Sequence, residues 1–312
     1  MKPFQKSCLT EGIRRKVKEE LVEMASALNR SIYEQQFKDI LDFAENSLLD
    51  IAHLWQNKEI NPEIQIRTSF SDKPKKAVNK VHRIGFYPVA ANPFHWAHLL
   101  IGLSALTELK LDKVIFLIAG EDPRKPDLVP VATRQIMGRN VLKIFDPLFE
   151  YSSIAAGNSF DGETNLFRFF NLNPEQRIEA LYIAGGDHCH RVNPKNNMPD
   201  TIQKLEENFL NCYRDNENFH QVSAAFIERG AIARPVETFL PICFLPAMPF
   251  EASSTMIREA LKNKDKSEAL ALLPYTAYQY IKKFDLYSSS SPCVKAVDRN
   301  FKVALRPAFG EI

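Results

Sequence analysis

The sequence has few cysteines, almost no net charge and no long apolar run, and each absence excludes a class of protein. Its five cysteines are odd in number and widely spaced, with no Cys-x-x-Cys pair. This pattern excludes a disulfide framework and a zinc ribbon and predicts a reducing compartment. With 40 basic and 38 acidic side chains the net charge is +2, so no broad field would attract nucleic acid or an anionic membrane. Any anion site must therefore be local.

Membrane spans and export signals have no counterpart in the sequence either. No apolar run reaches the roughly 18 residues that a membrane span needs. The first six residues lead into charged side chains instead of the apolar segment of a signal peptide. We therefore expect a cytoplasmic protein. The chain of 312 residues, 45% of them apolar, is long enough for one large or two modest globular domains.

Two stretches near the N-terminus show the apolar spacing of helices. From Thr10, a candidate N-cap, apolar residues follow at steps of three and four to Leu28, and a second such pattern runs from Ile32 to Trp55. Two amphipathic helices joined by a short turn form a hairpin whose apolar faces need a partner. That partner is either the main domain or another subunit, which would give a homo-oligomer. A linker follows, with a candidate short strand at 64–66.

The middle of the chain alternates between strand and helix patterns. An apolar run at 84–87 precedes helically spaced leucines from Leu99 to Leu109, and a nearly continuous apolar run follows at 113–120. Such a run is expected of a strand that is buried on both faces. Strand, helix and strand in this order predict a right-handed βαβ unit of an α/β, doubly wound parallel sheet. Open sheets of this kind bind ligands in the crevice at the carboxyl ends of their strands.

A pair of histidines, His95 and His98, follows the first of these strands. Residues three apart share a helix face, so both imidazoles would point into the crevice, where they suit a phosphate. Such a pair alone is more often structural than functional. A second stretch, 252–258, changes that balance because it predicts a helix start with three hydroxyl side chains and, one turn along, an arginine. The free backbone N–H groups of a helix start bind anions.

Together the two stretches resemble the signatures of the nucleotidylyltransferase superfamily, His-x-Gly-His and Ser-Ser-Thr-x-Ile-Arg. Three segments between and after them most resemble nicotinate and nicotinamide mononucleotide adenylyltransferases: a strand ending at Gly185-Gly186-Asp187, a strand ending at Arg229-Gly230, and a terminal helix at 273–281. The resemblance covers about residues 82–287. It implies a Rossmann-like nucleotidylyltransferase domain at 79–287, preceded by a helical extension and linker (1–78) and followed by a flexible tail (288–312).

The resemblance implies an enzyme that transfers AMP from ATP to nicotinate or nicotinamide mononucleotide and releases pyrophosphate, in NAD biosynthesis. Because the attacking phosphate is already an anion, such a site must supply in-line positioning and positive charge, and it needs no general base. Two alternatives remain open. One is a nucleotide-binding sensor or assembly protein of the same fold that has lost turnover. The other is a nucleotidylyltransferase with a different phosphate acceptor.

The resemblance also assigns individual roles. The residues that stabilise the transferring phosphates would be His95, His98 and Arg258. The residues that hold ATP would be Asn92, Gly185, Asp187, Ser253, Ser254 and Thr255. The residues that hold the mononucleotide would be Lys125, Arg134, Trp96 and Thr164, the last in a polar, Gly/Asn/Ser-rich segment at 151–175. Mg²⁺ would arrive bound mainly to ATP phosphates and water, and no dedicated cage of protein ligands is expected.

The turn before the histidines departs from the family pattern. Where the family usually carries Gly-Gly or Gly-Ser, this chain has Pro88, Val89, Ala90 and Ala91, and Ala97 replaces the glycine of the histidine motif. Proline removes a backbone donor, and side chains stand where a phosphate would approach. The altered turn favours the sensor. The intact histidines and the intact Ser-Ser-Thr-x-Ile-Arg stretch favour the enzyme, because a pure binder has no need of both.

Overall fold

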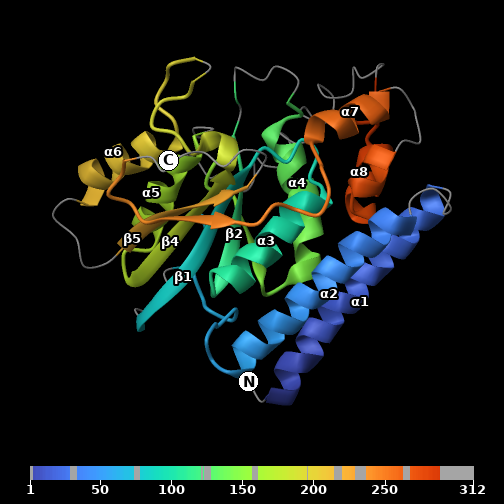
Figure 1. The fold of residues 1–312 in the computed structure, drawn as a ribbon, viewed down its shortest axis with the longest axis horizontal. Coiled ribbons are helices and arrows are strands. Elements are labelled where there is room, and N and C mark those ends of the chain that lie inside the picture. The colour runs from blue at the N-terminus through green and yellow to red at the C-terminus, as the bar shows by residue number, and fades with distance from the viewer. Residues whose placement is uncertain are drawn as a thin grey trace.

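A six-stranded parallel sheet with helices on both faces forms the centre of the molecule (Figure 1). The computed structural model describes residues 3–28, 34–73, 78–120, 122, 128–156, 161–194, 196–213, 220–228, 237–262 and 268–288. Within them the strand order is β3-β2-β1-β4-β5-β6, and all neighbouring strands are parallel. This is the order of a doubly wound Rossmann-like sheet. The predicted fold class is therefore confirmed.

The strands end together at one edge. The central strand β1 (Val78–Val89) lies between β2 (Lys113–Ile118) and β4 (Gln176–Gly185), and the outer strands are β3 (Phe149–Ser152), β5 (His220–Ile227) and β6 (Ile242–Leu245). The register pairs the last residues of β1 and β2, and likewise the last residues of β4 and β5. Every residue of β2 is buried, as its continuous apolar run predicts.

The helices divide between the two faces of the sheet. One core joins the sheet to α3 (Trp96–Glu108) and α4 (Val131–Leu142), and the other joins it to α5 (Gly162–Leu172) and α6 (Thr201–Tyr213). The chain winds outwards from β1 through β2 to β3 and then returns to β4 at the other side of β1. Because the winding reverses there, the topological switch point lies between β1 and β4, where such sheets bind ligands.

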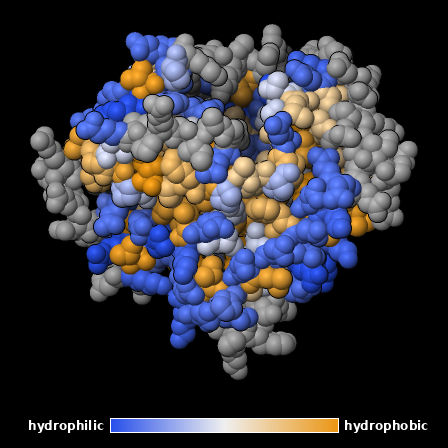
Figure 2. Space-filling view, in the orientation of Figure 1, coloured by the Kyte–Doolittle hydropathy of each residue, from blue (hydrophilic) through white to orange (hydrophobic). Residues whose placement is uncertain are grey.

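The N-terminal hairpin packs on the first of these cores. Its helices α1 (Pro3–Ala27) and α2 (Glu34–Gln56) lie side by side (Figure 1), with α2 against α3 and α1 against α8 (Tyr275–Lys283). The outer side of the hairpin is mostly hydrophilic (Figure 2). The buried side carries the apolar residues that the spacing singled out, among them Ile13, Val17, Leu21, Met24, Leu28, Ile40, Leu48, Ile51 and Trp55. The partner of the hairpin is thus the main domain, and no second subunit is needed to cover it.

Several local predictions differ from the structure. The first helix starts at Pro3, a residue suited to a first helical position, so Thr10 lies inside α1 and is not its N-cap. Residues 64–66 form no strand, although Ile64 and Ile66 are buried under the second core. The polar segment at 151–175 holds the end of β3 and the whole of α5. The strand end at 229–230 and the tail from residue 289 lie outside the described residues.

The remaining elements close the carboxyl edge of the sheet and its first face. They are the short turns η2 (Lys143–Phe145), η3 (Gly186–His188) and η4 (Glu268–Leu272) and the helix α7 (Ser254–Lys262). Helices α7 and α8 follow β6, as the serine stretch and the terminal pattern predict. Among the residues that the structure describes, none of the helices combines the length and apolarity of a membrane span.

Candidate active site

A cavity of about 430 Å³ opens at the carboxyl edge of the sheet. Residues at or just after the ends of four strands line it, namely Val89 (β1), Gly120 (β2), Gly185 (β4) and Ile227 (β5). Its volume falls within the range of small-molecule sites, roughly 300 to 1,000 Å³. The cavity therefore lies at the switch point, where the strand-helix pattern predicts a ligand.

The histidine motif lies at the turn from β1 into α3, and its two imidazoles differ in exposure. His98 lines the cavity, whereas His95 is 3% exposed and does not belong to the lining. The two rings stack with their centroids 3.8 Å apart. The backbone N–H of His95 donates to Nδ1 of His98 at 3.2 Å. Since a neutral imidazole whose Nδ1 accepts carries its proton on Nε2, the donor of the His98 ring is its Nε2–H group.

Helix α7 lies directly against the histidine turn. Ser254, 161 residues further along the chain, donates its hydroxyl to the backbone oxygen of Pro93 at 3.1 Å. Nη1 of Arg258 donates to the backbone oxygen of Asn92 at 2.8 Å. The serine stretch is thus bonded directly to Asn92 and Pro93, the residues just before the histidine motif.

The first turn of α7 has the form of an anion site. Ser253 precedes the helix, and its Oγ accepts from the backbone N–H of Met256 at 3.2 Å, which makes it the N-cap. The other backbone N–H groups of this turn, and the helix dipole, favour a negative charge. Thr255 is exposed, and its hydroxyl accepts from Nη2 of Arg258 at 3.2 Å. Two of the five guanidinium N–H donors are thus engaged within the protein. No residue of α7 lines the cavity, and the helix is joined instead to the turn between β1 and α3.

Arg134 occupies a different place from the predicted one. It is fully buried, and its guanidinium donates to four backbone oxygens, those of Val129 (2.7 Å), Ala90 (2.6 Å), Ala119 (2.8 Å) and Gly120 (3.1 Å). These carbonyls belong to the loops after β1 and β2 and to the approach to α4. The predicted contact with a mononucleotide does not fit this placement. Arg134 instead holds together the loops that frame the cavity.

Two further predicted contacts are also buried in the fold. Trp96 is 0% exposed within the first core, because the first turn of α3 faces the sheet. Asn92 is 3% exposed, and its Oδ1 accepts from the backbone N–H of Val129 at 3.2 Å and from the hydroxyl of Tyr287 at 3.0 Å. A buried Trp96 does not fit the predicted contact with a mononucleotide. A buried Asn92 side chain likewise does not fit the predicted contact with ATP.

The remaining predicted residues divide between the cavity and its surroundings. Gly185 and Asp187 line the cavity, and the Asp187 side chain is 64% exposed. Thr164 lies in the first turn of α5, where its hydroxyl donates to Oδ2 of Asp161 at 2.5 Å, and it does not belong to the lining. Lys125 lies outside the described residues.

Gly162, the first residue of α5, lies close to Pro88 at the end of β1, where the turn into α3 begins. A Cβ on Gly162 would lie 2.7 Å from Cγ of Pro88 and 2.4 Å from the hydroxyl of Tyr182, so only glycine fits there. At the other end of the turn Ala91 has a φ of 50°, a left-handed conformation that favours glycine. The turn thus keeps a glycine-like backbone although it has no glycine of its own.

Sequence reasoning missed a polar cluster on the α5–α6 side of the cavity. Its members are Asp161, Glu163, Tyr182, Thr201 and Lys204, all of which line the cavity. The hydroxyl of Thr201 donates to Oε1 of Glu163 at 2.7 Å, and Nζ of Lys204 donates to Oδ1 of Asp161 at 2.8 Å. The sequence marks only one member of the cluster locally. Asp161 is the N-cap of α5, and its side chain accepts from the backbone N–H of Thr164, three residues further along.

The two carboxyl groups of this cluster hold one proton between them. Burial and the neighbouring Asp161 charge raise the pKa of Glu163 to about 7. Burial also acts to raise the pKa of Asp161, but hydrogen bonds with Glu163, Lys204 and Thr164 lower it to about 2. Over most of the range between these values Glu163 is therefore neutral and Asp161 is charged. Burial raises the pKa of Tyr182, so its hydroxyl stays a donor.

Comparison with known proteins gives sequence relatives for about two thirds of the chain. No family model matches it. It is 28% identical over 201 residues to the probable nicotinate-nucleotide adenylyltransferase of Clostridium tetani, covering 63% of this chain and 94% of that protein. It is 27% identical over 213 residues to the protein of the same name from Clostridium perfringens, covering 66% of this chain and 98% of that protein. The structure of Plasmodium falciparum nicotinic acid mononucleotide adenylyltransferase complexed with NaAD aligns with a TM-score of 0.48 at 16% identity, over 66% and 97% of the two chains.

Proposed function

We propose that this chain, which belongs to the nucleotidylyltransferase superfamily, transfers AMP from ATP to nicotinate or nicotinamide mononucleotide and releases pyrophosphate, as in NAD synthesis. The observation that carries the proposal is the direct contact between the two motifs. Ser254 and Arg258 of α7 bond to the backbone of the turn that leads to His98, beside a cavity at the switch point of the sheet.

The reaction needs what these residues supply. An oxygen of the acceptor phosphate attacks the α-phosphorus of ATP, the bond from that phosphorus to the bridging oxygen breaks, and pyrophosphate leaves with the electron pair. In this proposal Nε2–H of His98 donates to the α-phosphate oxygens, on which charge gathers in the transition state. The N-terminus of α7 receives the departing pyrophosphate. Arg258 exchanges its bonds within the protein for the outer phosphates, which its planar fork suits.

The placement of the other residues narrows the set that would touch substrate. Gly185 and Asp187, at the end of β4, remain as the ATP ribose contact, because the exposed carboxylate can accept from sugar hydroxyls. Lys125 remains a proposed contact of the mononucleotide. Arg134, Trp96 and the Asn92 side chain are assigned to the framework.

The proposed reaction uses Mg²⁺ with its triphosphate substrate. In the part of the chain that the structure describes, no group of three or more histidine, cysteine or acidic side chains could hold a metal ion. Mg²⁺ would be held by ATP phosphates and water, and the exposed carboxylate of Asp187 in the lining would accept from the water ligands. The ion would neutralise part of the charge on the phosphates.

The charge of the lining favours one acceptor over the other. The described lining holds five acidic residues, Asp122, Asp161, Glu163, Asp187 and Asp200, and one lysine, Lys204. Glu163 is neutral below about pH 7 and Asp161 pairs with Lys204, so the net negative charge comes from the other three carboxylates. A nicotinate carboxylate would be repelled by this surface, whereas the carboxamide of nicotinamide is neutral and donates to carboxylates. We therefore expect a higher kcat/KM with nicotinamide mononucleotide, although the relatives are named for nicotinate nucleotide.

A pyrophosphate-release assay with ATP, Mg²⁺ and the two mononucleotides tests the proposal. Turnover is expected with at least one acceptor, and His98→Ala is expected to lower it by about a hundredfold or more, as for the loss of an electrostatic donor. His53→Ala, which removes an exposed histidine on α2, is the matched control and is expected to keep full activity. ATP binding without pyrophosphate release would favour the sensor instead, and an active His98→Ala protein would refute the role of His98.

A further inference from the structure

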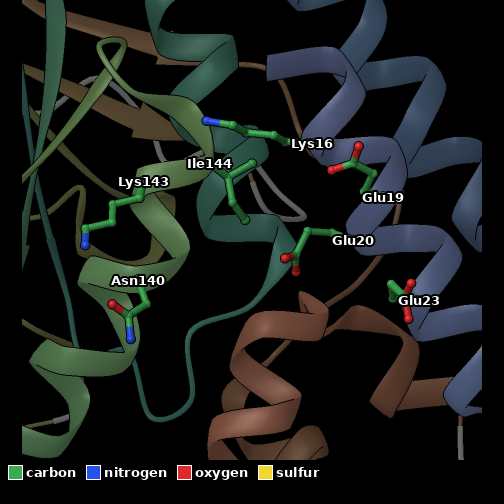
Figure 3. Close-up of a pocket in the computed structure, with 7 residues that line it drawn as sticks. All are labelled: Lys16, Glu19, Glu20, Glu23, Asn140, Lys143 and Ile144. Atoms are coloured by element: carbon green, nitrogen blue, oxygen red, sulfur yellow. The ribbon is translucent and has the colours of Figure 1, made fainter. Parts of the chain in front are cut away.

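The N-terminal hairpin supplies a cap to a helix at the other end of the chain. Glu20 extends from α1 toward the C-terminal helices (Figure 3), where its Oε2 accepts from the backbone N–H of Thr276 at 2.8 Å and its Oε1 from the hydroxyl of the same residue at 2.5 Å. Thr276 is the second residue of α8, and the N-cap of that helix is Pro274, which has no side-chain acceptor. Glu20 therefore fills the capping role, and its negative charge lies at the favourable end of the helix dipole.

The far end of α8 leads to the turn of the proposed active site. The backbone N–H of Leu286 donates to the carbonyl of Ile281 at 3.0 Å, which folds the chain back at the end of the helix. Tyr287 follows, only 7% exposed, with its hydroxyl donating to Oδ1 of Asn92 at 3.0 Å. Burial raises the pKa of Tyr287, so the hydroxyl keeps its proton and remains a donor.

Asn92 is bonded not only to Tyr287 but also to the loop before α4 and to α7. Its Oδ1 also accepts from the backbone N–H of Val129, in the loop that Arg134 clamps, and its backbone oxygen accepts from Arg258 of α7. The next residue, Pro93, accepts from Ser254. Tyr287 thus fixes Asn92, a residue of the histidine turn that is bonded both to the loop before α4 and to α7.

We propose that the N-terminal hairpin is a positioning element for the phosphate end of the site, with Glu20 and Tyr287 as its positioning residues. Glu20 fixes the start of α8, α8 fixes Tyr287, and Tyr287 holds Asn92 in the turn before His95. The kinetic consequence rests on the proposed adenylyl transfer, whereas the positional coupling is a property of the fold and can be measured without turnover.

Amide hydrogen exchange of the full chain tests the coupling. Two amides report on the turn, that of Val129, which donates to Asn92, and that of His98, which donates to the carbonyl of His95 at 3.1 Å. Tyr287→Phe keeps the ring and removes only the hydroxyl. We expect Tyr287→Phe and Glu20→Ala each to speed exchange of both amides by about tenfold, while the amides of β5 keep their protection.

Arg14→Ala is the matched control. Arg14 lies on the same helix and pairs with Glu45 of α2 at 2.7 Å and with Glu11 at 3.3 Å, so the variant loses an ion pair of the hairpin that does not involve α8. It is expected to leave both reporter amides unchanged. The double variant of Glu20 and Tyr287 is expected to match the larger single effect instead of their product, because both residues act through one path.

Kinetics add a second readout. With the preferred acceptor, Tyr287→Phe and Glu20→Ala are expected to lower kcat by about tenfold with little change in the KM for ATP, as for a misplaced donor. Unchanged exchange at Val129 and His98 in both variants would overturn the inference, as would an equal effect of Arg14→Ala. If the wild-type protein has no transferase activity, the proposed function fails while the exchange result still decides the coupling.

Discussion

Replacing Glu163 with glutamine is expected to stabilise the protein at pH 8 and to have a much smaller effect on its stability at pH 5. The carboxyl is only 6% exposed, and burial together with Asp161 raises its pKa from the ordinary 4.5 to about 7. Below pH 4.5 the group is protonated in the folded and unfolded chain alike. Between these two values the unfolded chain releases a proton that the folded protein keeps, so the free energy of unfolding falls as the pH rises.

Above pH 7 the folded protein must hold a buried charge. The difference of about 2.5 pKa units, at about 1.4 kcal/mol per unit, corresponds to a loss of up to about 3 kcal/mol. Glutamine has nearly the same shape as glutamate and can accept from Thr201. Because it is neutral at every pH, the unfolding free energy of the variant does not show this loss as the pH rises. Asp161, whose pKa is lowered to about 2, stays ionised over the whole range from pH 5 to 8 and does not affect the comparison.

Urea unfolding followed by circular dichroism at pH 5, 6, 7 and 8 measures the effect. The difference in unfolding free energy, Glu163→Gln minus wild type, should grow by about 2 or 3 kcal/mol between pH 5 and pH 8, from about 1 kcal/mol or less at pH 5. Glu207→Gln, which makes the same substitution at an exposed position on the neighbouring α6, is the control. A Glu163→Gln difference that stays constant from pH 5 to 8 would refute the shared-proton account of the cluster.

Three further predictions concern the turn and α7. Arg134→Ala leaves four backbone carbonyls without their donor and is expected to lower the unfolding free energy by about 3 to 5 kcal/mol in urea, whereas a residue that only bound substrate would leave it unchanged. Ala91→Gly relieves a left-handed φ of 50° and should raise the free energy of unfolding by about 1 kcal/mol; a lower melting temperature in calorimetry would contradict the strain. Arg258→Ala should raise the KM for ATP by about tenfold or more with the fold intact, and an unchanged KM would count against its phosphate contact.

The sequence predicted the parts of the site that depend on local patterns. The apolar run at 84–87 before the histidines lies in β1, the Gly-Gly-Asp segment lies at the end of β4, and the serine stretch starts α7. Each of these depends on apolar periodicity or on helix-start chemistry within about ten residues, which a sequence displays directly.

The predictions that failed depend on packing between distant segments. Arg134 and Trp96 have residue types suited to a ligand, and only the folded chain reveals that one is enclosed by carbonyls and the other by the core. The Glu163–Thr201 contact joins two helices that are separated by a strand, and no local pattern marks it. The sequence also could not identify what the hairpin packs against. An apolar helix face predicts that the face is buried, and it does not tell which part of the protein covers it.

The most direct test of the account is a crystal structure with ATP or a non-hydrolysable analogue. The account predicts one triphosphate at the meeting of the two motifs, with the α-phosphate within hydrogen-bond distance of Nε2 of His98 and the outer phosphates at the first turn of α7 beside Arg258. A triphosphate bound elsewhere on the molecule, or one that touched only one of the two motifs, would contradict it.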